Sequence, residues 1–192
     1  MLLPLVAWAL TGAAFFLKPG YGGAYASLPI RTYALTSGIT LDARPGWHEV
    51  RRLRTVLGDH LLARTDIGWL HLDPRSLEAK ALPAEGEIRT LLTDAFAIDP
   101  ERYGHIVAVD RNVVTTDTGV RVTLDWNVLT LAQRGRDTDW IDRIYKIHYL
   151  QWTGIPVVDR ILGGAGIVLV LLLSVLGLKL FVVRRPRGEG SL

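Results

Sequence analysis

Two apolar runs lie near the ends of the chain, and a long region of mixed polarity separates them. The second run, Ile161 to Val183, has eighteen uncharged residues before Lys179. At about 1.5 Å per helical residue these span roughly 27 Å, nearly the thickness of a bilayer's hydrocarbon core. Lys179 can lift its ammonium group to the headgroups on its flexible stem. The pattern predicts a transmembrane helix over 159–183, with a buried core helix as the alternative.

Cations follow this second run directly. Arg184, Arg185 and Arg187 lie in a short tail, 184–192. Positive charges beside a span mark the side that stays in the cytoplasm. We therefore expect a basic cytoplasmic tail.

The first run, Leu2 to Leu17, is shorter, at about 24 Å as a helix. One interpretation is a signal peptide cleaved near Ala24-Tyr25-Ala26, although no Lys or Arg precedes the run. The other, which fits better, is an uncleaved first transmembrane helix over 1–18. Ala7, Thr11 and Ala14 would give that helix a stripe of small residues for close packing. Both termini would then be cytoplasmic and the middle of the chain would lie across the membrane.

The middle of the chain changes repeatedly between helical and strand periodicity. Apolar residues at spacings of three to four predict amphipathic helices over Trp47–Leu57 and Glu85–Ala97. Val120 to Trp126 alternates strictly, as a strand with one solvated face should. Further strands are predicted at Arg31–Leu35, His60–Arg64, Trp69–Leu72, Leu77–Leu82, His105–Val109, Val113–Thr116 and Val128–Gln133.

Part of this pattern occurs twice. Thr65-Asp66-Ile67-Gly68 leads to Leu72-Asp73, a turn and Leu77, and Thr116-Asp117-Thr118-Gly119 leads likewise to Leu124-Asp125, a turn and Leu129. Two copies suit a duplicated unit of one helix and an antiparallel meander. The predicted class is α+β, with two transmembrane helices flanking an extracytoplasmic domain at 19–136.

A third amphipathic segment, 137–158, precedes the second apolar run. Ile141, Tyr145, His148 and Trp152 fall on one helical face, before Gly154 and Pro156 break the helix. Tyr and Trp are typical of headgroup depth, so an interfacial helix is predicted. The residues expected to anchor the chain in the membrane are Trp8, Tyr145, Tyr149, Trp152, Lys179, Arg184, Arg185 and Arg187.

The formal charge of +3 reflects topology and does not indicate nucleic-acid binding. Between Lys18 and Arg160 the chain has eighteen Lys or Arg residues and eighteen Asp or Glu residues, so their charges cancel. The net charge of +3 therefore comes from the four basic residues after Arg160, reduced by one through Glu189. The chain has no cysteine, which excludes disulfides, thiolate metal sites and a cysteine nucleophile.

Asp117-Thr118-Gly119 matches the short signature of aspartic peptidases. Aspartate and glycine are also favoured in hairpin turns, and the matching Asp66-Ile67-Gly68 lacks the hydroxyl residue of a paired catalytic loop. We expect a turn and no catalytic residue. Arg51, Arg52 and Arg54 are expected on the solvated face of the first helix.

Four of the five histidines, His48, His60, His71 and His105, are expected at the surface, solvated or hydrogen-bonded. If the hairpin turns at Asp66-Ile67, His60 and His71 share a face diagonally. No metal site is expected. His148, on the aromatic face beside the membrane, is the one candidate cofactor residue, as an axial haem ligand whose partner ligand another subunit would supply.

Several stretches resemble the PepSY-domain family with its associated transmembrane helices. They are Trp8 through Gly12, Phe16 through Gly20, Asp117 through Gly119, Ile147 through Gly154, and Gly163 to Gly177. The resemblance implies an α+β domain held outside a bacterial inner membrane. It also implies links to peptidase regulation or, in larger relatives, to haem-carrying ferric reduction, with His148 similar to a histidine near their final helix.

The sequence therefore predicts a non-catalytic, membrane-anchored protein that binds other proteins as an accessory or regulatory subunit, with other membrane subunits or further copies as partners. No bound cofactor is expected on this interpretation. The alternative is an electron-transfer or ferric-reductase-like subunit that shares a b-type haem through His148.

Overall fold

A computed structural model describes residues 2–40 and 44–183 of the chain. The chain divides into two compact units. The α+β unit runs from Gly20 to Asp139, close to the domain expected at 19–136, and the helical unit comprises the chain up to Pro19 and from Trp140 onward. Arg184, Arg185 and Arg187 lie outside the described residues.

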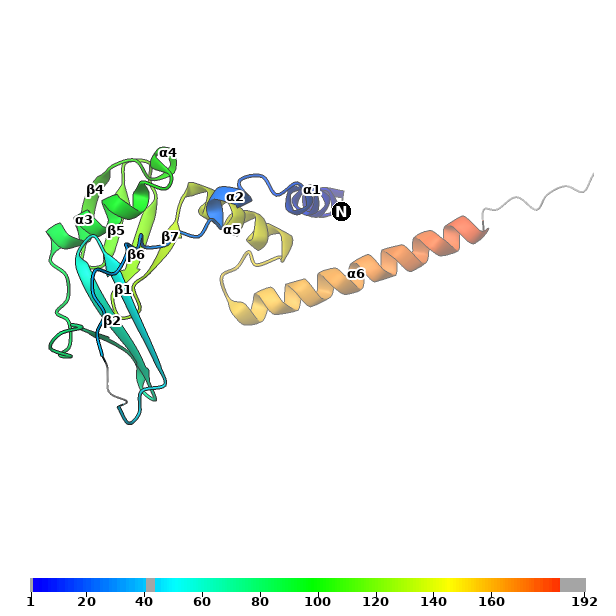
Figure 1. The fold of residues 1–192 in the computed structure, drawn as a ribbon. Helices are drawn as coiled ribbons and strands as arrows, with labels where there is room; N and C mark the ends of the chain where they lie inside the picture. Colours follow the sequence, from blue (N-terminus) through cyan, green and yellow to red (C-terminus); the bar gives the residue numbers. More distant parts are fainter. Residues whose placement is uncertain (1, 41–43, 184–192) are drawn as a thin grey trace, which may run out of the picture. The chain divides into compact units, whose positions relative to one another are not determined.

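The α+β unit contains two antiparallel sheets (Figure 1). The first has the order β1-β2-β3, with β1 at Glu49–Thr55, β2 at Gly58–Thr65 and β3 at Gly68–Leu72. The second has the order β4-β5-β6-β7, with β4 at Ile106–Asp110, β5 at Val113–Thr116, β6 at Arg121–Asp125 and β7 at Thr130–Arg134. Three helices complete the unit: α2 (Tyr21–Ala24), α3 (Glu85–Phe96) and α4 (Pro100–Tyr103).

Helix α3 follows the periodicity that predicts it. Its apolar stripe, Ile88, Leu91, Leu92, Ala95 and Phe96, is buried, as period-3.6 spacing requires for a helix packed on a core. The Glu87 carboxylate accepts a hydrogen bond from the Ala84 N–H and so satisfies one free donor at the helix start. The next helix, α4, is capped at its start by Asp99, whose side chain accepts a hydrogen bond from the Arg102 N–H, and Pro100 occupies its first helical position.

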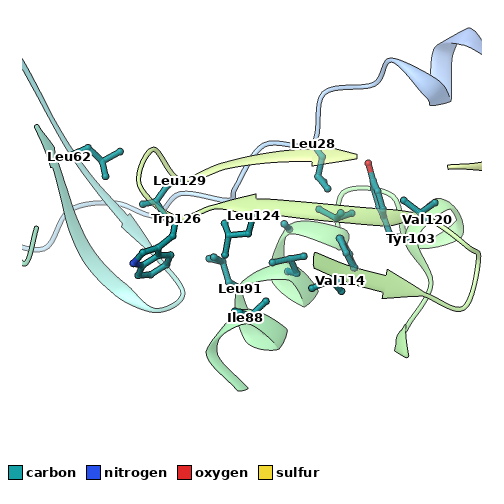
Figure 2. Packing of buried hydrophobic residues seen from close by; sticks show 14 residues of the cluster. Leu28, Leu62, Ile88, Leu91, Tyr103, Val114, Val120, Leu124, Trp126 and Leu129 are labelled. Atoms are coloured by element: carbon teal, nitrogen blue, oxygen red, sulfur yellow. The ribbon is translucent and has the colours of Figure 1, made fainter. Parts of the chain in front are cut away.

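The main hydrophobic cluster joins α3 to both sheets. Figure 2 shows Leu91 and Ile88 of α3 beneath Leu124, with Trp126 and Leu129 on the side of the cluster toward Leu62 of β2. A smaller cluster, Leu61, Ala63 and Leu72, lies with Ile39, Trp47 and Leu77. Strand β2 therefore has buried residues on both faces, because Leu61 and Ala63 alternate with His60 and Leu62.

The helix predicted over Trp47–Leu57 is wrong, because Glu49–Thr55 is strand β1. All seven of its residues pair with β2, and Leu53 and Thr55 face the core side. Gly58, at φ 99°, supports the hairpin turn and does not end a helix. Arg51, Arg52 and Arg54 consequently lie on a strand, where they pair with Glu49 and Asp59.

The internal repeat has a structural counterpart. Each copy forms a hairpin at its first turn, which contains an aspartate. After the second strand of that hairpin, each copy makes another turn that begins with an aspartate and leads to a leucine with a left-handed backbone. These leucines are Leu77, at φ 59°, and Leu129, at φ 50°. In the first copy, however, the expected strand at Leu77–Leu82 is reduced to one bridge between Leu72 and Ala79, and Arg31–Leu35 contributes only the bridge from Tyr33 to Arg54. Among the described residues between α2 and β3, no helix corresponds to α3 of the second copy.

The helical unit contains three helices: α1 (Leu2–Leu17), most of α5 (Arg136–His148) and α6 (Pro156–Val183). Among the described residues, α6 is the helix long and apolar enough to cross a membrane, and α1 is shorter. Helix α5 ends earlier than the 158 expected, because the backbone turns left-handed at Leu150 (φ 56°). Trp152 therefore lies beyond the helix, where its indole N–H donates to the Ile147 carbonyl.

Candidate functional site

A groove of about 660 Å³ opens on the α+β unit beside Trp126. Its apolar lining comes from Leu82, Pro83, Ile88, Leu124 and Trp126, and its polar lining from Arg111, Asn112, Thr123, Asp125 and Asn127. The Asn112 side-chain amide donates to the Leu124 carbonyl, which holds it at the lining. In the described part of the chain, the side chains of Arg111 and Asn127 make no hydrogen bond or ion pair, so both are available to a ligand.

Trp126 connects two parts of this groove. It follows β6 directly, and its ring is buried in the main cluster. The indole N–H donates to the Ala81 carbonyl at 3.0 Å, next to Leu82 of the lining. The Trp126 side chain therefore ties the segment that carries Leu82 and Pro83 to the end of β6.

A chain of buried hydrogen bonds starts at the Trp126 backbone. The Trp126 carbonyl lies 2.7 Å from His71 Nδ1, His71 Nε2 lies 2.9 Å from His60 Nδ1, and His60 Nε2 lies 2.8 Å from Thr55 Oγ1. His60 is 0% and His71 5% exposed. The surface position expected for these two histidines is wrong, although the shared face at a turn of Asp66-Ile67 is confirmed.

The proton positions in this chain follow from its ends. A carbonyl only accepts, so His71 carries its hydrogen on Nδ1 and accepts at Nε2. His60 must then donate from Nδ1 and accept at Nε2 from the Thr55 hydroxyl, whose oxygen accepts from the Leu57 N–H. Both rings are neutral in this arrangement, and every polar atom of the two rings has a partner.

Burial opposes protonation of both rings. Desolvation lowers the pKa of His60 to about 3, with Lys80 and His71 adding to the effect and Asp59 opposing it. Desolvation also lowers the pKa of His71 to about 4, again helped by Lys80 and opposed by the Trp126 hydrogen bond. The pair is therefore uncharged near neutral pH and takes up protons only in acid.

The helical unit has a second cavity, of about 410 Å³, with an almost entirely apolar lining. Trp8, His148, Tyr149 and Trp152 lie along it together with residues of α6, including Gly163 and Gly166. The His148 ring is fixed by Trp8, stacked at 5.4 Å, by Phe15, edge-on at 4.8 Å, and by Thr11, whose Oγ1 lies 2.9 Å from Nδ1. Tyr145 also contacts Phe15, and its ring stacks on that of Tyr149.

The His148 tautomer can be inferred in the same way. The single hydroxyl hydrogen of Thr11 goes to a carbonyl of its own helix, Ala7 at 2.9 Å or Trp8 at 3.0 Å. His148 Nδ1 must then be the donor to Thr11, which leaves a lone pair on Nε2. Nε2 makes no hydrogen bond within the residues that the structure describes. The ring is thus positioned as an acceptor or a metal ligand.

Asp117 has a structural role, as expected for a turn. It lies in the β5–β6 hairpin, where Gly119 adopts φ 82°, and its carboxylate accepts from the His105 backbone N–H at 2.8 Å. That hydrogen bond is the largest cause of the lowered pKa of Asp117. Asp66 lies in the other hairpin turn and contacts His48 at 2.6 Å. His48 and His105 are accordingly the hydrogen-bonded surface histidines expected.

Among the described residues, no group of three or more His, Asp or Glu side chains is arranged to hold a metal ion. Comparisons of the chain with protein-family models, with curated proteins and with solved structures find no match.

The burial of the His60–His71 pair was not predicted, although their shared face was. Its signal was present: alternation along Gly58–Thr65 places His60 on the face of Leu62, which is buried. The groove gave no such signal, because its residues come from three separate segments of the chain.

Proposed function

We propose that this protein is a membrane-anchored binding module, whose α+β unit holds an extended segment of a partner protein in the Trp126 groove. The groove carries this proposal because it combines an apolar lining with polar groups at one place. Apolar residues accept side chains of a bound segment. Asn112, Asn127 and Thr123 carry the amide and hydroxyl groups that pair with a peptide backbone, and Arg111 suits a carboxylate.

The proposed setting is a bacterial inner membrane with the α+β unit on the periplasmic side. The length and apolar composition of α6 support a span, and α1 is proposed as a second, shorter one. Exposed Trp8, Tyr149 and Trp152 suit headgroup depth. Membership of the PepSY-domain family, and a role as an accessory or regulatory subunit, remain part of this proposal.

A photo-reactive amino acid at Leu82 tests the groove in whole cells. Leu82 lines the groove and is 80% exposed, so its replacement leaves the core intact. We expect a discrete cross-linked product of defined mass from position 82. The yield of this product should fall by at least about tenfold when Arg111→Glu reverses the charge at the rim.

The matched control places the same amino acid at Ile67, which is 92% exposed at the tip of the β2–β3 hairpin. Identical products from positions 67 and 82, or a product unaffected by Arg111→Glu, would contradict binding in the groove.

A second function is favoured by the geometry at His148. A fixed imidazole whose Nε2 lone pair is free, beside an apolar cavity, suits an axial ligand of a b-type haem. Bound haem would supply one-electron transfer. Thr11 would orient the ring through Nδ1, and a partner subunit would supply a second ligand, because His148 is the one histidine among the described residues that line the cavity.

Absorption spectroscopy of the protein purified from haem-replete membranes tests this alternative. We expect a Soret band that disappears in His148→Ala, that shifts or weakens in Thr11→Val, and that persists in His105→Ala. A preparation without the band, or a band that survives His148→Ala, would eliminate His148 as a haem ligand.

A further inference from the structure

The hydrogen-bond chain from Thr55 to Trp126 has no place for an additional proton. A proton on His71 Nε2 would face the N–H of His60 Nδ1 across 2.9 Å. His60 could reverse its two bonds, but the Thr55 hydroxyl hydrogen would then lose its acceptor, because His60 Nε2 would itself carry a hydrogen. Either arrangement also places a positive charge among buried groups, which is costly without a counter-ion.

The charged groups around the pair do not offset that charge. Lys80, from the segment after β3, is a cation that opposes protonation of both rings, and its ammonium donates to the Asp59 carbonyl. Asp59 of β2 is the anion that favours protonation of His60, but Arg52 of β1 engages its carboxylate at 2.6 Å. The remaining contacts, Thr55 and Trp126, are uncharged.

Any rearrangement of His71 reaches the groove through one residue. The Trp126 carbonyl is the acceptor for His71, and the Trp126 ring lies 4.4 Å from the His71 ring and 5.6 Å from that of His60. The same residue lines the groove and donates to Ala81, next to Leu82. Trp126 therefore connects the histidine pair to the groove lining.

We propose that the His60–His71 pair is a proton-sensitive latch, which keeps the groove in the form that binds its ligand while the pair is neutral and releases that ligand when the pair is protonated. This inference rests on the proposed function of the groove as the binding site. A domain outside the cytoplasm is exposed to the pH of its surroundings, so external acid would reach the latch.

The absence of cysteine allows a test on the full chain without any ligand. A Leu82→Cys variant carries an environment-sensitive fluorophore on the groove, and Ile67→Cys carries the same label at the distant hairpin tip. In detergent micelles, titration from pH 7.5 to 3 should change the emission of the label at position 82, with a midpoint well below 6.5, the ordinary pKa of histidine. The label at position 67 should not respond at that midpoint.

Glutamine variants identify the group that titrates. In His71→Gln the side-chain amide can still donate to Trp126 and its oxygen can accept from His60, but the residue cannot take up a proton. We expect the response to be lost in His60→Gln/His71→Gln and retained in His105→Gln, whose parent histidine is 93% exposed. A response that persists unchanged in the double variant overturns the latch.

A second variant covers the case in which the double variant does not fold. Lys80→Met removes the cation that opposes protonation, so the midpoint should move to higher pH. An unchanged or lowered midpoint overturns the latch, as does a response at position 67 that coincides with the one at position 82. These outcomes are independent of the cross-linking at Leu82, so failure of the latch and failure of the binding function are distinguishable.

Discussion

Replacing Trp126 with alanine is expected to lower the free energy of unfolding of the α+β unit by about 3–5 kcal/mol. The substitution removes a buried indole from the main cluster and leaves a cavity between Leu62 and Leu124. It also removes the N–H that donates to the Ala81 carbonyl, and it removes the aromatic ring that packs against His60 and His71. The loss should therefore lie toward the upper end of that range.

Urea unfolding of the full chain in detergent, followed by circular dichroism, measures this loss. Trp140→Ala is the matched control, because Trp140 is 56% exposed, and its substitution should change the free energy by about 0.5 kcal/mol or less. Similar losses for the two variants would show that the Trp126 ring is not packed in the main cluster.

Acidification from pH 7 to pH 5 is expected to destabilise the same unit by about 2 kcal/mol for each of His60 and His71. Their pKa values are lowered in the folded state, to about 3 and about 4, from an ordinary value of 6.5. Below pH 6.5 the unfolded chain therefore binds more protons than the folded one. Stability is fully present above that pH and is lost as the pH falls toward the folded-state pKa values.

Urea midpoints at pH 7, 6 and 5 test the sign and the size of this effect. The His60→Gln/His71→Gln variant should show a much flatter pH dependence, and His105→Gln should follow the original protein. A stability that is constant between pH 7 and 5 would mean that the two histidines are not buried in neutral form.

Sequence periodicity is most informative for elements in which one face alone is buried. Helix α3 and strand β6 each have a clean apolar side, so spacing identifies both their type and their buried residues. The long apolar helix α6 was predicted from composition alone. Position 148 could be proposed as a site because aromatic residues surround it at helical spacing.

Strand β1 could not be identified in this way. Val50, Leu53 and Leu57 fit a helix as well as a strand, and the choice is made by pairing with β2, which is a tertiary interaction. The same error contributed to the surface position expected for His60, because β1 as a helix leaves β2 without its neighbour on that side. Trp126 lines the groove and contacts the His60–His71 pair, but its position in the sequence indicates only the end of an alternating strand.

Strand β2 is paired on both sides and buried on both faces, and this has a consequence for how the domain comes apart. The two hydrophobic clusters share this strand, one on each face. Opening either cluster strips contacts from the strand that holds the other. The two sheets are thus bound into a single cooperative unit, and loosening one of them while the other stays intact is disfavoured.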